Sequence, residues 1–186
     1  MANYVEPSPL PPINRYITTS SKTGTALLDT TISNTALWTG AGVANFFLGY
    51  CTSAFPVSFS TNADIKTYSE YLAAPPGLVV PNGTVLRIVD MKPGGLSPMH
   101  RTISLDYGVV LEGEVELILD GGEKRVMKRG DICVQRGTNH AWRNCSKTEW
   151  SRMLYVLTQA APVELEDGKK LEEDLGGMVG VRKSAQ

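Results

Sequence analysis

From residue 84 onward the chain is a series of short β-strand patterns separated by turn signals, and this pattern restricts the fold more than any other in the sequence. Residues 84–91 are β-branched and apolar, and they end at a break of proline and glycine at 93–95. Residues 114–119 alternate between apolar and acidic side chains, and residues 120–122 are a hairpin signal. Further strands are expected at residues 107–111, 125–127, 132–135 and 153–157. Short strands at this spacing predict an all-β sandwich or barrel.

The residues ahead of this region are less regular. Four prolines within residues 7–12 predict an extended segment on the surface. Aromatic residues at 45–50 predict a strand, and the alternation at 57–60 predicts another. Asn62 is expected to cap the only helix, because apolar side chains between residues 65 and 72 recur at helical spacing.

At the C-terminal end, residues 163–171 predict a hairpin, and the glycine-rich residues 176–181 predict a surface tail. We therefore expect one structural domain in three parts. Residues 1–83 form an N-terminal arm and extension that packs on the barrel, residues 84–160 form the barrel core, and residues 161–186 form the hairpin and tail.

The composition suits a soluble globular protein and argues against several classes of partner. The 186 residues are 42% hydrophobic and 20% charged, with a formal net charge of −1. The sequence has no basic stripe for a nucleic acid and no apolar stretch long enough for a membrane span. The first residues lack the pattern of a secretory signal, so we expect a cytoplasmic location, with Cys51, Cys133 and Cys145 as buried free thiols.

The chain contains only two histidines, His100 and His140, and each lies within a spaced motif. The first motif consists of Gly94, His100, Asp106 and Gly113, and the second of Gly130, Gly137, His140 and Asn144. This paired spacing resembles the two motifs of the cupin superfamily over residues 84–160, and in particular the small single-domain cupins of fungal natural-product gene clusters. The resemblance implies a double-stranded β-helix, or jelly-roll barrel, with an N-terminal extension and one short helix.

The resemblance also implies that His100, Thr102, Asp106 and His140 face one cavity. The family's metal site has two histidines separated by one residue, then a glutamate, then the second-motif histidine. Here Thr102 replaces the second of those histidines, and Asp106 replaces the glutamate. A threonine hydroxyl is a poor ligand for a divalent transition metal. Two hypotheses stay open: the other three side chains hold a divalent metal such as Fe, Zn or Mn, or no cofactor is bound and they perform acid–base chemistry directly.

The leading hypothesis is an enzyme of secondary metabolism, a dehydratase-like lyase or an isomerase, that carries out dehydration, isomerisation or cyclisation of a polyketide-like substrate. His100 and His140 are expected to be its catalytic acid–base pair, and Asp106 is expected to orient and stabilise an imidazolium. The first alternative is a metal-dependent oxygenase or decarboxylase that uses the same three side chains as ligands. The second alternative is a non-catalytic cupin that binds a small molecule.

Three further side chains are candidates for substrate binding. Thr102 lies two residues from His100 and shares its strand face, Arg87 interrupts an apolar strand, and Trp142 lies two residues after His140, where it walls the pocket or belongs to the core. The expected partner is a small-molecule substrate, with no nucleic acid and no membrane. We also expect a homodimer in which part of residues 1–60 covers the barrel or its mate, because exposed edge strands are usually covered.

Overall fold

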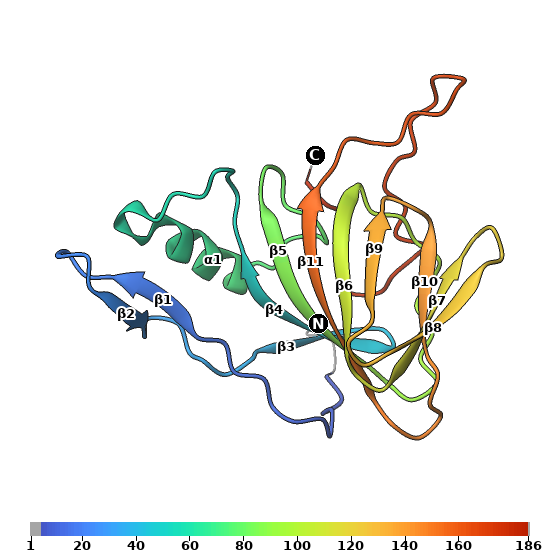
Figure 1. The fold of residues 1–186 in the computed structure, drawn as a ribbon, viewed down its shortest axis with the longest axis horizontal. Helices are drawn as coiled ribbons and strands as arrows, with labels where there is room; N and C mark the ends of the chain where they lie inside the picture. The colour runs from blue at the N-terminus through green and yellow to red at the C-terminus, as the bar shows by residue number, and fades with distance from the viewer. Residues whose placement is uncertain (1–4, 186) are drawn as a thin grey trace.

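The computed structural model describes residues 5–185, and it is an all-β fold with eleven strands and one α-helix (Figure 1). The strands are β1 Ile17–Ser20, β2 Ala26–Asp29, β3 Trp38–Ala41, β4 Ala44–Cys51, β5 Thr84–Met91, β6 Ser104–Glu112, β7 Glu114–Leu119, β8 Lys124–Lys128, β9 Ile132–Arg136, β10 His140–Asn144 and β11 Ser151–Gln159. The short 3₁₀ helix η1 covers Ser60–Asn62, and α1 covers Ala63–Ala73. No helix in the described part of the chain is long and apolar enough to cross a membrane.

Two sheets pack face to face and form a jelly-roll barrel. A six-stranded sheet has the order β3-β4-β5-β11-β6-β9, and a three-stranded sheet has the order β10-β7-β8. Side chains of both sheets meet in one apolar cluster of Met91, Val110, Val115, Met127, Trp142 and Met153. This confirms the all-β barrel. The β1–β2 hairpin and α1 lie to one side of it (Figure 1).

Two strands ahead of residue 84 belong to the large sheet. The strand predicted at 45–50 is confirmed as part of β4, which pairs with β5 and brings β3 into the large sheet. The N-terminal arm then packs on this sheet. The backbone carbonyl of Pro11 accepts a hydrogen bond from Arg152 at 2.6 Å, and Glu6 forms an ion pair with Lys92 at 3.0 Å.

The helix prediction is confirmed, but three local details differ from what the sequence predicted. Asn62 precedes α1 in a left-handed conformation and makes no side-chain capping bond; its Oδ1 instead accepts from Thr19 Oγ1 at 3.0 Å. The strand predicted at 57–60 is wrong, because these residues lead through an irregular segment into η1 and Phe59 is exposed. The thiols also differ, since Cys51 is buried but Cys145 is exposed.

The C-terminal residues contain the predicted hairpin and a largely exposed segment that is bound to the barrel surface. Residues 163–171 form the hairpin, with a bridge between Glu164 and Lys170, and it projects from the barrel (Figure 1). Residues 174–184, which we call the C-terminal strap, then fold back onto the barrel. Asp174 pairs with Arg101 through two backbone hydrogen bonds of 2.6 and 3.0 Å, and Ser184 Oγ accepts from the Val79 N–H at 3.1 Å. The strap is therefore fixed at both ends.

Candidate active site

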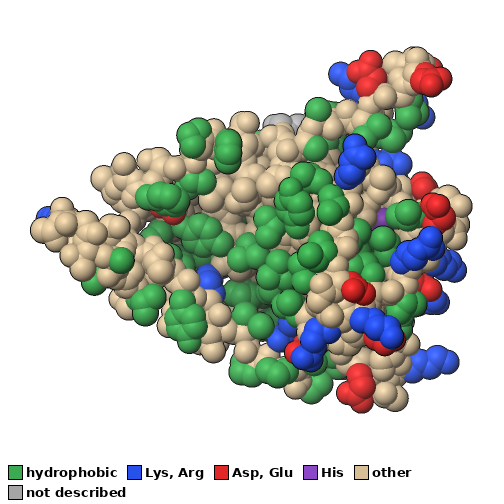
Figure 2. Space-filling view, viewed as in Figure 1, with side chains coloured by type: hydrophobic (Ala, Val, Ile, Leu, Met, Phe, Trp, Pro, Cys, Tyr) green, Lys and Arg blue, Asp and Glu red, His purple; other side chains and the backbone are tan. Residues whose placement is uncertain are grey.

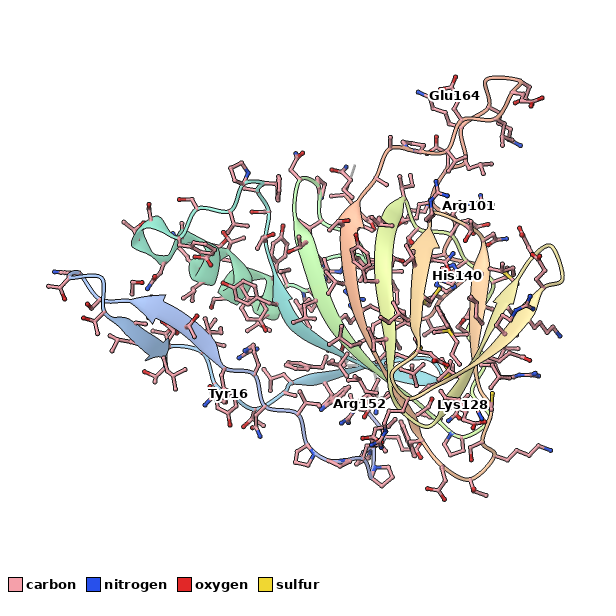
Figure 3. All side chains as sticks on the ribbon, viewed as in Figure 1. Tyr16, Arg101, Lys128, His140, Arg152 and Glu164 are labelled. Carbon is pink, nitrogen blue, oxygen red and sulfur yellow. The ribbon has the colours of Figure 1, made fainter. Side chains whose placement is uncertain are left out.

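The two histidines lie side by side inside the barrel. The backbones of His100 and His140 exchange two hydrogen bonds of 2.8 and 2.9 Å, which holds the loop before β6 against the start of β10. Their ring centroids are 4.3 Å apart. His140 lies among the strands, whereas Arg101 and Arg152 lie toward opposite ends of the barrel (Figure 3). The convergence implied by the two motifs is what the structure shows.

Each imidazole is held by a carbonyl group two residues earlier in the chain. His100 Nδ1 lies 2.8 Å from the Pro98 carbonyl oxygen, and His140 Nδ1 lies 2.9 Å from that of Thr138. A carbonyl oxygen only accepts hydrogen bonds, so Nδ1 carries the proton in both rings. In the neutral rings both Nε2 atoms therefore keep a lone pair, which can accept a proton.

Burial favours the neutral form of both rings. His100 is 7% exposed and His140 is 3% exposed. Burial, together with the neighbouring His100, lowers the pKa of His140 to about 3, although its bond to the Thr138 carbonyl opposes the change. Burial also lowers the pKa of His100, although its bond to the Pro98 carbonyl opposes the change. Near neutral pH the site therefore contains two unprotonated bases and no resident imidazolium.

Asp106 is the carboxyl group of the same site. Burial raises its pKa to about 6, while the Ser104 and Thr102 hydroxyls act in the opposite direction. Ser104 Oγ donates to Thr102 Oγ1 at 2.8 Å, and Thr102 Oγ1 lies 3.4 Å from Asp106 Oδ2. Asp106 Oδ1 has no hydrogen-bond partner among residues 5–185. In this part of the chain Asp106 is thus bound to Thr102 and not to an imidazole.

All six candidate residues of the sequence analysis line one cavity of about 270 Å³. Trp142 packs edge-on against His140 with centroids 5.8 Å apart, and Tyr155 packs against Trp142 at the same distance. Gly108 makes room for Tyr155, because a Cβ at this position would lie 3.0 Å from Tyr155 Cε1. The remaining wall is mostly apolar, so the polar groups of the site face a largely apolar space.

Sequence reasoning missed part of this wall. Gly177, Met178 and Val179 of the C-terminal strap line the cavity, as do Phe46 and Tyr155. Tyr155 was detectable in principle, because it lies between Met153 and Leu157 on a predicted strand and faces inward with them. The strap gave no such signal, because a glycine-rich segment has no periodic apolar pattern.

The side chains present do not fit the family's metal centre. Among residues 5–185, no group of three or more His, Cys, Asp and Glu side chains is arranged to hold a metal ion. The position of the family's second histidine is occupied by Thr102, whose hydroxyl lies between Ser104 and Asp106. A neutral hydroxyl in that position is a weak donor for a divalent transition metal.

Known proteins resemble the chain over most of its length. The cupin domain family model matches residues 87–157. Phomopsin biosynthesis cluster protein D of Diaporthe leptostromiformis is 50% identical over 169 residues, covering 90% of this chain and 87% of that protein. Oryzines biosynthesis cluster protein J of Aspergillus oryzae is 47% identical over 168 residues, covering 89% and 93%.

Two more distant proteins complete the comparison. The cupin-domain-containing oxidoreductase srdB of Neurospora crassa is 37% identical over 164 residues, covering 87% of this chain and 81% of that protein. Among solved structures, the polyketide cyclase RemF of Streptomyces resistomycificus has a TM-score of 0.42 at 19% identity, covering 63% of this chain and 66% of that chain. Since the family model spans both histidine motifs and the curated relatives extend well beyond it, this chain belongs to the cupin family.

Proposed function

We propose that this cupin is an enzyme of fungal secondary metabolism that catalyses a proton-transfer step without redox change on a small molecule. The setting is supported by relatives at 50% and 47% identity that are named as proteins of phomopsin and oryzine biosynthesis clusters. The reaction class is supported by one observation above all. Two imidazoles with their Nδ1 protons fixed on backbone carbonyls share a cavity with a carboxyl group whose pKa is raised.

In this proposal the imidazoles supply the base and Asp106 supplies the acid. For a dehydration, an imidazole Nε2 takes the proton next to the substrate carbonyl. The electron pair of that C–H bond forms a double bond, and the adjacent hydroxyl leaves as water with the proton of the Asp106 carboxyl. For an isomerisation the same acid protonates carbon instead. Positioned proton transfers of this kind typically accelerate a reaction by about 10²–10⁴-fold each.

The sequence predicts that one histidine is the acid and the other the base, whereas this proposal makes Asp106 the acid. An imidazolium donor requires a protonated ring, and burial lowers the pKa of both rings. Burial has the opposite effect on a carboxylic acid, so Asp106 retains a proton closer to neutral pH than a solvated aspartate does. Thr102 then positions the carboxyl group.

A redox reaction is the second candidate, because the relative srdB at 37% identity is named as an oxidoreductase. It requires a redox-active group, and a metal-dependent oxygenase or decarboxylase requires ligands from His100, Asp106 and His140. The weak donor set in the described residues speaks against that site. Fungal relatives alone do not decide between the two reactions.

The test begins with the metabolites of the source organism with and without the protein. The compound that accumulates is supplied to purified protein before and after treatment with a chelator, and the metal content is measured in parallel. Full turnover after chelation supports the proposal. The proposal is contradicted, and the second candidate favoured, if removal of a stoichiometric metal abolishes turnover and addition of that metal restores it. A ligand-binding role is supported if the purified protein binds the compound and never converts it.

A further inference from the structure

A buried cation without a carboxylate partner lies in the wall of the cavity that contains both histidines. Arg87 is 6% exposed, and although burial lowers its pKa to about 10, the side chain stays protonated near neutral pH. Its Nη2 donates to the Gly77 carbonyl at 3.1 Å, and its guanidinium lies 5.0 Å from the centroid of the Phe46 ring. Its Nε has no hydrogen-bond partner among residues 5–185. A carbonyl and a ring face leave its charge uncompensated.

A second buried arginine, Arg152, differs from Arg87 because its charge is paired with a carboxylate. Arg152 is 3% exposed, and its Nε and Nη2 grip the carboxylate of Asp90 at 2.5 and 2.6 Å. Its Nη1 donates to the Pro11 carbonyl. In Arg87, Nε has no partner within the described residues and Nη2 donates to a backbone carbonyl. None of the ion pairs found there includes Arg87.

Other unpaired groups do not share this placement. Arg15 and Arg101 also have an Nε without a partner in the described residues, but both side chains are only half-buried and neither lines the cavity of the two histidines. Asp106 lines the cavity but is bound to Thr102. In the large sheet β5 and β6 are separated by β11, which places Arg87 and Asp106 on strands about 10 Å apart.

We propose that Arg87 binds a carboxylate group of the substrate, so that the protein acts on a small, largely apolar molecule with one carboxylate. This inference deepens the proposed function and rests on it for the identity of the cavity as a substrate site. A carboxylate accepts hydrogen bonds from a guanidinium and compensates its charge, and among residues 5–185 Arg87 is the one arginine or lysine that lines this cavity. A phosphate dianion fits less well, because the cavity offers it one cation within mostly apolar walls. A neutral carbonyl leaves the buried charge uncompensated.

The geometry also orients the substrate. Arg87 pairs with Tyr155 across β5 and β11, and Tyr155 pairs with Gly108 across β11 and β6. The Tyr155 ring thus lies in the wall between the cation and the strand that carries Asp106. A substrate with its carboxylate on Arg87 extends along this wall and presents its other end to Asp106 and the imidazoles.

Equilibrium binding of simple probes tests the inference without any turnover. Isothermal titration of the full chain compares hydrocinnamate with its amide, decanoate with its amide, and phenyl phosphate. We expect the wild-type protein to bind at least one carboxylate about tenfold or more tightly than the matched amide. Arg87→Met should remove this preference, Arg87→Lys should retain part of it, and Arg143→Met, which changes an arginine outside the cavity, should leave it intact.

Thermal unfolding without ligand separates a binding role from a structural one. Arg87→Met should unfold at the same temperature as the wild type or higher, because it removes an uncompensated buried charge. Arg152→Met should unfold at a lower temperature, because it leaves the buried Asp90 carboxylate without its partner. The inference is overturned if no carboxylate binds, if phenyl phosphate binds best, or if Arg87→Met still prefers a carboxylate to its amide. It is also overturned if Arg87→Met fails to fold and Arg87→Lys shows no such preference. A protein that binds the carboxylates yet converts no metabolite contradicts the proposed function alone.

Discussion

At the scale of single residues, a hydrogen bond to a backbone carbonyl fixes the Nδ1 proton of both histidines. In each case a carbonyl two residues earlier accepts from Nδ1, and burial keeps the ring neutral. The sequence predicted the positions of His100 and His140, because the motif spacing is local. It did not predict their protonation, because burial depends on strands that are distant in the chain.

His100→Asn and His140→Asn separate the two functions of each ring. The Asn side chain can still donate to the Pro98 or Thr138 carbonyl, but it offers no Nε2 base. We expect turnover of the accumulated metabolite to fall by about 10²–10⁴-fold in each variant with little change in thermal stability. Asn139→Ala, beside His140 and bonded only to the exposed Asp120 side chain, is the control that should keep its activity.

The lowered pKa of His140 also predicts how stability depends on pH. The folded chain binds fewer protons than the unfolded chain between the ordinary pKa of 6.5 and about 3, so stability falls as pH decreases through this window. Each proton bound only by the unfolded chain costs up to about 1.4 kcal/mol per pH unit. Urea titrations should show a smaller acid loss for His140→Asn than for the wild type. Equal losses would mean that His140 titrates normally.

The pKa shift of Asp106 affects the pH dependence of stability in the opposite direction to that of His140. Its pKa in the fold, about 6, lies above the ordinary 3.8, so stability attributable to this group falls as pH rises through that interval, and the acid form is lost above it. Wild-type kcat/KM should therefore decrease as pH rises past about 6. Asp106→Asn should be slow, show no such decrease, and be more stable than the wild type at alkaline pH. A wild-type profile that is flat through this range would refute the acid role.

At the scale of elements, the position of the C-terminal strap was not predictable from local sequence patterns. The strands of the barrel were predictable because alternation and turn residues are written locally in the sequence. The strap is placed by contacts between distant residues, such as the pairing of Asp174 with Arg101 and of Ser184 with Val79. Local patterns do not encode such contacts. The same limit explains why the sequence predicted the polar residues of the cavity but missed Met178 and Val179.

Gly176→Ala should detach the strap. Gly176 has a φ of +58°, and an added Cβ would lie 2.1 Å from the Met99 carbonyl oxygen. We expect faster proteolysis of the C-terminal residues and a higher KM for the accumulated metabolite. Gly168→Ala is the matched control, because Gly168 has a φ of +81° but open space around its Cβ position. If both variants behave alike, backbone strain explains the effect and the Met99 contact does not.

At the scale of the whole molecule, the exposed apolar side chains lie mainly on one face and one sheet edge. Apolar side chains gather over the middle of the face where β11 and β6 lie, and charges gather toward β7 and β8 (Figure 2). On the edge strand β9, Ile132 is 66% exposed and Val134 is 54% exposed, and Tyr107 of β6 is exposed beside them. Because exposed apolar edge strands tend to pair with another chain, we predict that this edge pairs with a second copy in a homodimer.

Light scattering at micromolar concentration should therefore report a dimer. Ile132→Lys and Val134→Lys should shift it toward a monomer, because each places a charge on the apolar edge. Val126→Lys changes an equally exposed valine on β8 of the other sheet and should leave the dimer intact. A wild-type protein that is monomeric at these concentrations would contradict this prediction.

We propose that His100, His140 and Asp106 move protons on a substrate within one cavity without a redox step. The most direct measurement is the mass of the product that purified, chelator-treated protein forms from the metabolite that accumulates without it. We expect a product that is lighter by one water or equal in mass, formed without added metal and absent with the His140→Asn variant. A product that carries an additional oxygen or has lost carbon dioxide, formed only after metal is restored, would contradict it.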